Sequence, residues 1–594
     1  MELRHRGGAG CRAAILALAL VAGGPIVLAA QASGAVEGRV VSEVGEALDG
    51  AEIRLEPSEG GIVRRVESDR TGAFRIGFLA PGSYLLSTRR IGYRPGEPLL
   101  VSVGIGATIR LTVTLVPVPV ALDSLVVSAP RVTLTRRDTE FATRLTAREL
   151  AILPTFNEAR SLVAFTPGAR PDQIWGAASA QANLYLLDGI SVNHPGLGGD
   201  FLQPSVTWID QVEVRGLGAG AETGNFQGGV VNYLTKSGTN RLEGQVRATF
   251  ESHRLNGSNL GLTEVGSEPG SRYELDGQLR GPLVRDRLHF ALFGQLIGRD
   301  LRVQNQVPQR PAGLVEPAPD FTERKLLGKL RWRPAGGDLL QLELGRLELD
   351  GDPAGLTGFE SPEAAIRQTF RVTLPSFGWN HTWSERSNLD FRIGGFTSRD
   401  DRDPLAGGVV PGLLTLQDVG ALSFQNAVFG ERRRASSVDL SLAWSVGTRL
   451  FGLAHDLRIG AQHQIGSWDF TRSRTGGMTW RPFDRRVAPF WDPADPASWY
   501  SQDVIASTWG GETRLDSRVE NSALFLQDYI EVTPRVRLNP GLRLGRWVGR
   551  LTPTNGRTFT AATDHALEPR VGLVVDLDQR GTLVAKAHWG RFHQ

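Results

Sequence analysis

Few residues in this sequence have the types and spacing that chemistry requires. Two pairs of histidines follow alternating stretches, His455 with His463 and His588 with His593, and we interpret them as solvated side chains rather than metal ligands. An acidic run at Asp400, Asp401 and Asp403 offers the oxygen ligands that Ca²⁺ prefers, but it is more simply a solvated loop. The motifs HExxH, GxSxG, CxxC and the P-loop are all missing from the sequence. We therefore predict no enzyme activity, no catalytic residue, no metal and no cofactor.

Composition narrows the class of protein. The 594 residues are enough for several domains, and 41% of them are hydrophobic. No long apolar run follows the first thirty or so residues, whereas a membrane helix needs roughly 20 apolar residues. That leaves a soluble protein or a transmembrane β-barrel, whose strands hide their apolar character in alternation. The net charge is +3 without a basic stripe, so nucleic acid is a poor candidate partner.

The first 32 residues are typical of a secretory signal peptide. A positively charged start precedes the apolar stretch from Ala13 to Val27, and Ala30-Gln31-Ala32 is a cleavage pattern. A membrane anchor is the alternative, but the apolar stretch is short for one. The only cysteine, Cys11, would be removed with the signal, so we expect neither disulfides nor thiol chemistry in the mature chain.

Residues 35–116 predict a small all-β module. Short apolar strands are separated by turn sequences such as Asp69-Arg70-Thr71-Gly72. Seven or so strands in ~80 residues indicate a β-sandwich. The pattern "DxxGxF" from Asp69 to Phe74 and "PGxY" from Pro81 to Tyr84 resembles the carboxypeptidase regulatory-like domain. That resemblance implies a binding or spacer module, not a peptidase.

Three apolar runs between glycine and Asx turns lie from Asn183 to Asn240. Asp188-Gly189 suits a two-residue hairpin turn, because glycine accepts a positive φ without strain. In order, the runs resemble the plug domain of TonB-dependent outer-membrane receptors, whose patterns are "YxxDG", "IxxVEVxxG" and "GGxxNxxTKSGTN". They are Tyr185–Gly189, Ile209–Gly216, which is one residue shorter than the family pattern, and Gly228–Asn240. We therefore assign residues 132–240 to a small α+β plug.

Residues 117–131 form a linker punctuated by prolines. Within it lies an apolar run that could pair along a sheet edge of another chain. The family resemblance implies that this run is the TonB box, the segment offered to the periplasmic protein TonB. Its residues are Asp123, Ser124, Leu125, Val126, Val127, Ser128 and Ala129. The alternative is the last strand of the preceding sandwich.

Residues 241–594 alternate between apolar and polar side chains over long stretches. Leu340, Leu342 and Leu344 alternate with polar or small residues, and Val438 to Trp444 does the same. By period alone, a soluble sandwich and a membrane barrel are both open, and the plug resemblance favours the barrel. About 13 to 14 strands can be placed, whereas the family barrel has about 22. We therefore expect an incomplete barrel and a chain that is a piece of a longer protein.

The predicted fold is mainly β: an N-terminal β-sandwich, a plug and a transmembrane antiparallel β-barrel. The sequence "TKSGTN" and the N-terminal module resemble the Oar-like branch of the family in particular. The resemblance implies an outer-membrane receptor and transporter. It further implies TonB, outer-membrane lipid and an extracellular ligand of unknown identity as partners. Two alternatives stay open: a surface binding or adhesion protein of the same architecture without transport, and a soluble secreted multidomain β-protein.

Overall fold

The structure is a computed structural model of the chain. It describes residues 34–593 apart from the following positions: 59–62, 80–81, 91–92, 105–107, 117–138, 154–157, 171–172, 176–178, 200–201, 217, 256–266, 305–313, 335–336, 358–359, 385, 418–419, 483–503, 509–511, 534, 555 and 579–582.

The N-terminal domain is a two-sheet sandwich, as predicted. One sheet has the order β4-β1-β7 and the other β3-β2-β5-β6. Alternate residues of both sheets point inward, and Val36, Ile53, Leu55 and Leu86 form part of a buried apolar core. The strands are β1 (Gly34–Ser42), β2 (Glu52–Pro57), β3 (Arg64–Glu67), β4 (Ala73–Leu79), β5 (Gly82–Arg89), β6 (Leu99–Val103) and β7 (Thr108–Leu115).

The plug is a five-stranded mixed sheet with short helices beside it. Its strand order is β12-β11-β14-β13-β8. Asp188 and Gly189 form the predicted tight turn with φ values of 48° and 88°, a conformation that glycine and aspartate tolerate. The strands are β8 (Ala142–Thr146), β11 (Leu184–Leu187), β12 (Ile190–Ser191), β13 (Ile209–Arg215) and β14 (Val230–Thr235); the short hairpin β9 (Ala169–Arg170) and β10 (Gln173–Ile174) and the helices α2 (Ala147–Leu150), η2 (Ala159–Phe165), η3 (Ala180–Ala182) and η4 (Val206–Trp208) complete it.

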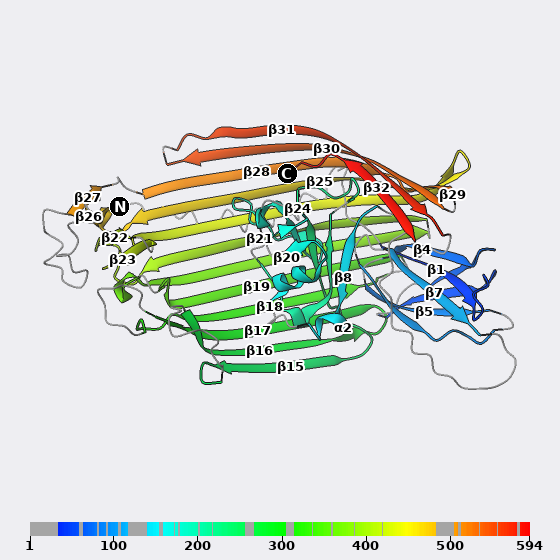
Figure 1. Cartoon of the computed structure of the whole chain (residues 1–594), viewed down its shortest axis with the longest axis horizontal. Helices are drawn as coiled ribbons and strands as arrows, with labels where there is room; N and C mark the ends of the chain where they lie inside the picture. The colour runs from blue at the N-terminus through cyan, green and yellow to red at the C-terminus, as the bar shows by residue number, and fades with distance from the viewer. Residues whose placement is uncertain are drawn as a thin grey trace.

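A 14-stranded antiparallel sheet curves around the plug (Figure 1). The order of its strands follows the chain, except that β28 pairs with β25 and β30 and the short β29 also pairs with both β25 and β30. The strands are β15 (Glu243–Ser252), β16 (Ser267–Val284), β17 (Leu288–Val303), β18 (Asp320–Trp332), β19 (Asp338–Ala354), β20 (Ile366–Ser384), β21 (Ser387–Pro404), β24 (Phe429–Leu450), β25 (Leu453–Arg474), β28 (Glu512–Gln527), β29 (Ile530–Thr533), β30 (Val536–Pro553), β31 (Phe559–Asp576) and β32 (Val584–Gly590).

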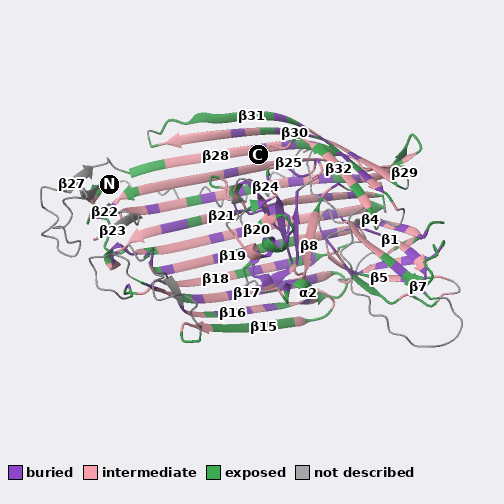
Figure 2. Cartoon of the chain, viewed as in Figure 1, coloured by how far each residue is buried: buried purple, intermediate pink, exposed green. Residues whose placement is uncertain are grey.

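The alternation of the long strands separates an apolar outer face from a polar inner face. Leu342 and Leu344 are 53% and 59% exposed, whereas Glu343 between them is 2% exposed because it faces the plug. Figure 2 shows the same alternation of buried and accessible positions along neighbouring strands. A soluble sandwich would bury its leucines and expose its glutamates. The mainly β fold with a barrel-type sheet is therefore confirmed.

The acidic run at Asp400, Asp401 and Asp403 was predicted to be a loop, and that prediction was wrong. All three residues lie within β21. Basic residues on the same strand and on β24 hold them in ion pairs; Arg402 contacts Asp400 at 3.1 Å, and Arg432 contacts Asp401 at 3.4 Å. Aspartates close together in a strand repel one another, and the arginines on the same and the neighbouring strand compensate their charge.

A small sheet lies beyond the end of the barrel that is farther from the N-terminal domain. Its order is β23-β22-β26-β27. The aromatic-rich stretch from Trp480 to Trp499 suggests a long loop by its sequence, but Trp480 lies in β26, and residues 483–503 fall outside the described part of the chain. The strands are β22 (Gly412–Gln417), β23 (Gly420–Phe424), β26 (Met478–Pro482) and β27 (Val504–Thr508); the helices η5 (Pro362–Ala364) and η6 (Thr475–Gly477) lie in loops of the same half.

The N-terminal domain sits against the opposite end of the barrel (Figure 1). Arg75 of β4 forms an ion pair with Asp456 of β25 at 2.6 Å, and it also contacts Glu37 within its own domain at 3.5 Å. We call this end of the barrel proximal and the other end distal. Helices in the described part of the chain lack the combined length and apolarity that crossing a membrane demands.

Candidate functional site

The contact between plug and barrel is rich in charged and polar groups. On the barrel's inner face, Lys329, Arg543, Arg570 and Glu568 are all nearly fully buried. Removing charges from water costs several kcal/mol each unless they are paired. Their partners on the plug therefore hold it together with apolar clusters such as Trp208 with Phe293 and Leu327.

Asp188, the turn residue of the "YxxDG" motif, anchors one side of the plug. It pairs with Lys329 of β18 at 3.1 Å, and Lys329 also contacts Glu343 of β19 at 3.2 Å. Thr235 donates to Asp188 through its backbone N–H at 3.0 Å and its hydroxyl at 2.6 Å. Arg392 of β21 donates to the Asp188 carbonyl at 2.9 Å. One barrel lysine is thus shared by a plug carboxylate and a barrel carboxylate.

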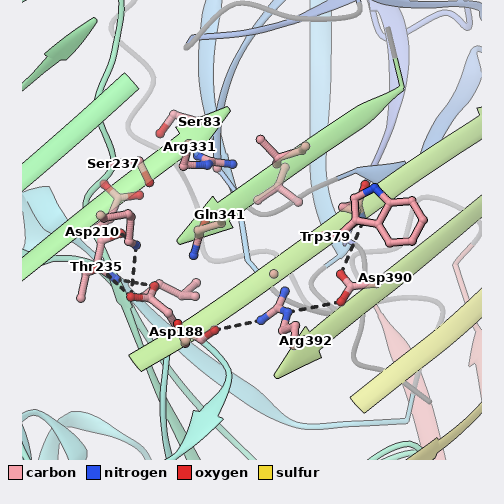
Figure 3. Close-up of a pocket in the computed structure, with 18 of the residues that line it drawn as sticks. Ser83, Asp188, Asp210, Thr235, Ser237, Arg331, Gln341, Trp379, Asp390 and Arg392 are labelled. Atoms are coloured by element: carbon pink, nitrogen blue, oxygen red, sulfur yellow. Dashed lines mark hydrogen bonds and ion pairs between the residues drawn. The ribbon is translucent and has the colours of Figure 1, made fainter. Parts of the chain in front are cut away.

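A cavity of about 100 Å³ opens beside this anchor (Figure 3). The plug lines it with Asp188 and Thr235, and the barrel contributes Arg331 and Arg392. Ser83 of the N-terminal domain lies at the same cavity. All three parts of the protein therefore meet at the proximal side of the Asp188 anchor.

A second anchor holds the loop from residue 219 to residue 223 on the other side of the plug. Arg570 of β31 donates to the carbonyls of Gly220 at 2.5 Å and Thr223 at 2.6 Å, and its second nitrogen contacts Glu568 at 2.6 Å. The Glu568 side chain is 0% exposed and that of Arg570 1%, so the pair is dry. Nearby, Arg543 donates to Gln462 at 2.8 Å, and Gln527 accepts from the backbone N–H of Ala221 at 2.8 Å.

The "VEVR" run of β13 builds a charge network inside the plug. Glu213 is fully buried and is held by Arg144 at 2.6 Å and by Arg215 at 3.5 Å. Burial by itself would lower the pKa of Arg215, but the nearby Glu140 and Glu213 outweigh it and raise the pKa above its ordinary value. The motif therefore places a network of buried ion pairs inside the plug.

Gly238 of the "TKSGTN" run marks the junction where the plug passes into the barrel. A Cβ atom added there would stand 2.9 Å from the carbonyl oxygen of Gly281, and closer still to that of Phe290. Both obstacles are backbone atoms of the barrel wall, which cannot rotate away as a side chain can. Close backbone approach explains why glycine occupies this position.

The loop after β12 forms the distal tip of the plug and touches the barrel wall at His194. The His194 ring packs edge-on against Trp468 of β25, with ring centroids 5.7 Å apart. Its Nδ1 accepts the backbone N–H groups of Gly196 at 3.1 Å and Leu197 at 3.0 Å. Burial, with a smaller contribution from the positive charge of Arg433, lowers the pKa of His194 to about 4. The ring is therefore neutral at physiological pH and serves as an acceptor.

Acidification is expected to open this tip. The pKa of His194 in the folded protein lies below its ordinary value of 6.5. The contribution of neutral His194 to the stability of the loop is therefore fully present above about pH 6.5, and it is lost as the pH falls through about 4. Protonated Nδ1 can no longer accept the two N–H groups. The His194 ring signal, followed by NMR in detergent micelles, should titrate with a midpoint near 4. His194→Asn, whose side-chain oxygen can accept without titrating, should remove the pH dependence. A midpoint near 6.5 would contradict the assignment.

The predicted site residues fall in different places. The TonB box, Asp123 to Ala129, lies outside the described residues. His455 pairs with Asp528 at 2.7 Å and His463 contacts Ser522 at 2.9 Å, so the two are held by separate partners. His588 lies in β32 and His593 follows that strand. Within the described ranges no group of three or more potential ligands could hold a metal ion.

The anchoring residues Lys329, Arg392 and Arg570 were missed by the sequence analysis. Each is a basic residue on the polar, inward-facing side of an alternating strand. Many polar residues that only contact water inside the barrel occupy the same kind of position. Alternation alone shows on which face of the sheet a residue lies. It does not show which of the inward-facing residues contact the plug.

Comparison with known families identifies two regions of the chain. Residues 35–116 match the carboxypeptidase regulatory-like domain, and residues 316–591 match the family described as TonB dependent receptor-like, beta-barrel. The TonB-dependent transporter Oar of Myxococcus xanthus is 29% identical over 243 residues, which are 38% of this chain and 23% of Oar. The match therefore spans less than a quarter of that relative.

Solved structures share the fold. The outer membrane transporter YddB from Escherichia coli superposes with a TM-score of 0.51 at 15% identity, covering 76% of this chain and 61% of YddB. The ferric yersiniabactin uptake receptor FyuA from Yersinia pestis gives a TM-score of 0.51 at 12% identity, covering 74% of this chain and 62% of FyuA. This chain thus spans about three fifths of each structure. Residues 316–591 therefore belong to the TonB dependent receptor-like β-barrel family, residues 35–116 belong to the carboxypeptidase regulatory-like domain family, and the chain shares the plug-in-barrel fold of the solved transporters.

Proposed function

We propose that the chain is part of an outer-membrane receptor that imports an extracellular ligand, energised by TonB from the periplasm. The N-terminal domain and the TonB box would lie on the periplasmic side, at the proximal end of the barrel. The distal end, with the His194 tip of the plug, would face outside. Moving the plug, rather than any bond-making step, is the work that this assignment requires.

The polar character of the plug-to-barrel contact is the observation that carries the proposal. A domain meant to stay in place permanently is most simply held by a continuous apolar core. Here the apolar contacts between plug and wall, such as those of Trp208 with Phe293 and Leu327, are divided into separate clusters, and buried ion pairs such as Lys329 with Asp188 lie between them. Water entering between plug and wall can replace such bonds one by one, whereas it cannot replace apolar contacts. A plug held in this way is suited to being pulled aside.

The TonB box supplies the handle in this proposal. Its apolar residues Leu125, Val126 and Val127 have strong strand propensity, and an added strand binds chiefly through main-chain hydrogen bonds. Main-chain pairing tolerates a change of side chain, but it does not tolerate the loss of a backbone N–H or a fixed φ.

The test measures binding of the protein, purified in detergent, to the purified periplasmic domain of TonB. Leu125→Pro is expected to weaken binding by about tenfold or more, because proline removes a donor and disrupts the strand. Leu125→Ala, the matched control, should stay within about threefold of the unchanged protein, because it keeps the backbone pairing. Deleting Asp123 to Ala129 should abolish uptake and leave extracellular binding intact.

Equal affinities for the proline and alanine variants would remove the box assignment. Unchanged uptake after the deletion would likewise overturn the box assignment.

An adhesion or binding protein of the same architecture is the second candidate. The favouring feature is the N-terminal sandwich, whose domain type implies a binding or spacer module and whose Arg75 contacts the barrel at Asp456. Dependence on energy separates the two functions: an adhesin keeps working in cells that lack TonB, whereas a transporter stops.

A further inference from the structure

The outer face of the barrel changes character abruptly toward its distal end. On β24, outward Trp444 is 44% exposed and Val438 is 50% exposed, and the first charged outward residue is Arg434. On β18, outward Trp332 is followed by Leu330 and Leu326 and then by Arg324. The apolar band therefore has tryptophan at its proximal edge and arginine at its distal edge.

The height of this band matches a membrane. Ten residues separate Trp444 from Arg434 on one strand. At about 3.3 Å per residue and a strand tilt near 40°, that is about 25 Å along the barrel axis, the height of the apolar band of outer-membrane barrels. Barrels commonly carry aromatic girdles at both interfaces. Here the distal interface on β18 and β24 carries arginine instead.

Three of these arginines stand side by side on neighbouring strands. Arg371 of β20 is directly opposite Arg399 of β21, and Arg399 is directly opposite Arg434 of β24. We call this set the arginine row. Side chains directly opposite in a sheet are close neighbours, and like charges in such positions destabilise it. A row of this kind is favourable when an anion lies over it.

Carboxylates within the protein offset the row only in part. Asp401 pairs with Arg399 and also lies 3.4 Å from Arg432 and 3.9 Å from Arg434, so one aspartate serves three guanidinium groups. Arg371 contacts Asp350 at 2.7 Å. The Arg399 side chain is 59% exposed and that of Asp401 is 9% exposed. Asp401 thus lies beneath Arg399, whereas Asp350 is about as exposed as Arg371, so the most accessible guanidinium group of the pairs in the row is that of Arg399.

We propose that the arginine row binds the phosphate groups of a phosphorylated glycolipid in the outer leaflet of the membrane. The guanidinium group matches phosphate with two parallel hydrogen bonds. Two strand spacings place the outer members of the row about 10 Å apart, which suits a broad headgroup with more than one phosphate. The row would set the depth of the barrel in the membrane, and the bound glycolipid would form part of the outer surface of the receptor.

This proposal rests on the membrane placement in the proposed function, but its test does not involve TonB or uptake. The detergent-solubilised protein is titrated with an acylated diglucosamine carrying two phosphates, and bound lipid is counted by native mass spectrometry. Arg399→Gln should weaken binding about tenfold, because it removes a charge-assisted hydrogen bond. Arg367→Gln is the matched control: Arg367 is outward on β20, is 57% exposed and pairs with Asp352 at 2.7 Å, outside the row. It should change binding less than about twofold.

A second readout separates a binding role from a structural one. Without glycolipid, Arg399→Gln should leave thermal stability unchanged or raise it, because a like-charge contact is relieved. With glycolipid, the stabilisation seen in the unchanged protein should shrink. Arg434→Gln is expected to repeat both results and serves if the first variant does not fold.

Equal weakening by Arg399→Gln and Arg367→Gln would overturn the proposal. So would equal affinity for phosphatidylglycerol, which carries one phosphate, because it would indicate a general attraction to anionic lipid. If the protein binds the glycolipid as described but does not bind TonB, the proposal for the arginine row stands and the transport proposal fails.

Discussion

Lys329→Met is expected to release the β11–β12 side of the plug. Methionine keeps most of the side-chain volume but leaves Asp188 and Glu343 facing each other without a cation, and both carboxylates are nearly fully buried. Breaking a buried ion pair by removing one partner costs about 3–5 kcal/mol, because the remaining charge is uncompensated. The loss should appear as opening of the plug rather than unfolding of the barrel, since the barrel's ladders are untouched.

Hydrogen exchange measured by mass spectrometry on the detergent-solubilised protein checks this result. Peptides from β11, β12 and β14 should lose protection, whereas those from β19 should keep it. Lys325→Met is the matched control, because Lys325 lies four residues away on the same inward face of β18 and pairs with Glu323 of the same strand at 2.8 Å. Unchanged protection in Lys329→Met would show that Asp188 is held by Thr235 and Arg392 alone.

Arg570→Met is expected to free the loop from residue 219 to residue 223. The change removes the donor to the Gly220 and Thr223 carbonyls, and it leaves Glu568 buried without its cation. It also removes the contact of the guanidinium with the Phe592 ring, 4.1 Å from the ring centroid. A cost of about 3–5 kcal/mol is expected on the same grounds as for Lys329.

Limited proteolysis together with hydrogen exchange distinguishes this variant from the first. Protection should fall in the loop from residue 219 to residue 223 and stay high in β11 and β12. Arg537→Met is the control: Arg537 also points inward, from the neighbouring strand β30, and contacts Glu531 of β29 at 3.4 Å. If Lys329→Met and Arg570→Met each lost protection across the whole plug, the two anchors would act as one unit.

The fold could be predicted well from local patterns. Alternation such as Leu342, Glu343 and Leu344 follows from the two-residue period of a strand, so strand positions and faces were visible in the sequence. The hairpin at Asp188-Gly189 was equally local, because its positive φ values need those residue types. The acidic run of β21 was missed because aspartates are poor strand formers when considered alone, and some of the arginines that compensate them, such as Arg432, lie on another strand.

The sequence by itself determined the β class of the fold, the family resemblance and the alternation that builds the barrel wall. Each depends on residues close together in the chain, where the backbone period and the turn chemistry act. Only the tertiary structure decided that Asp188 meets Lys329, that Arg570 holds Gly220, and that Arg371, Arg399 and Arg434 stand in one row. The first two contacts join residues more than a hundred positions apart. The physical reason is that pairing between distant charges depends on strand register and on how the plug is seated, and a one-residue shift in either would exchange every partner.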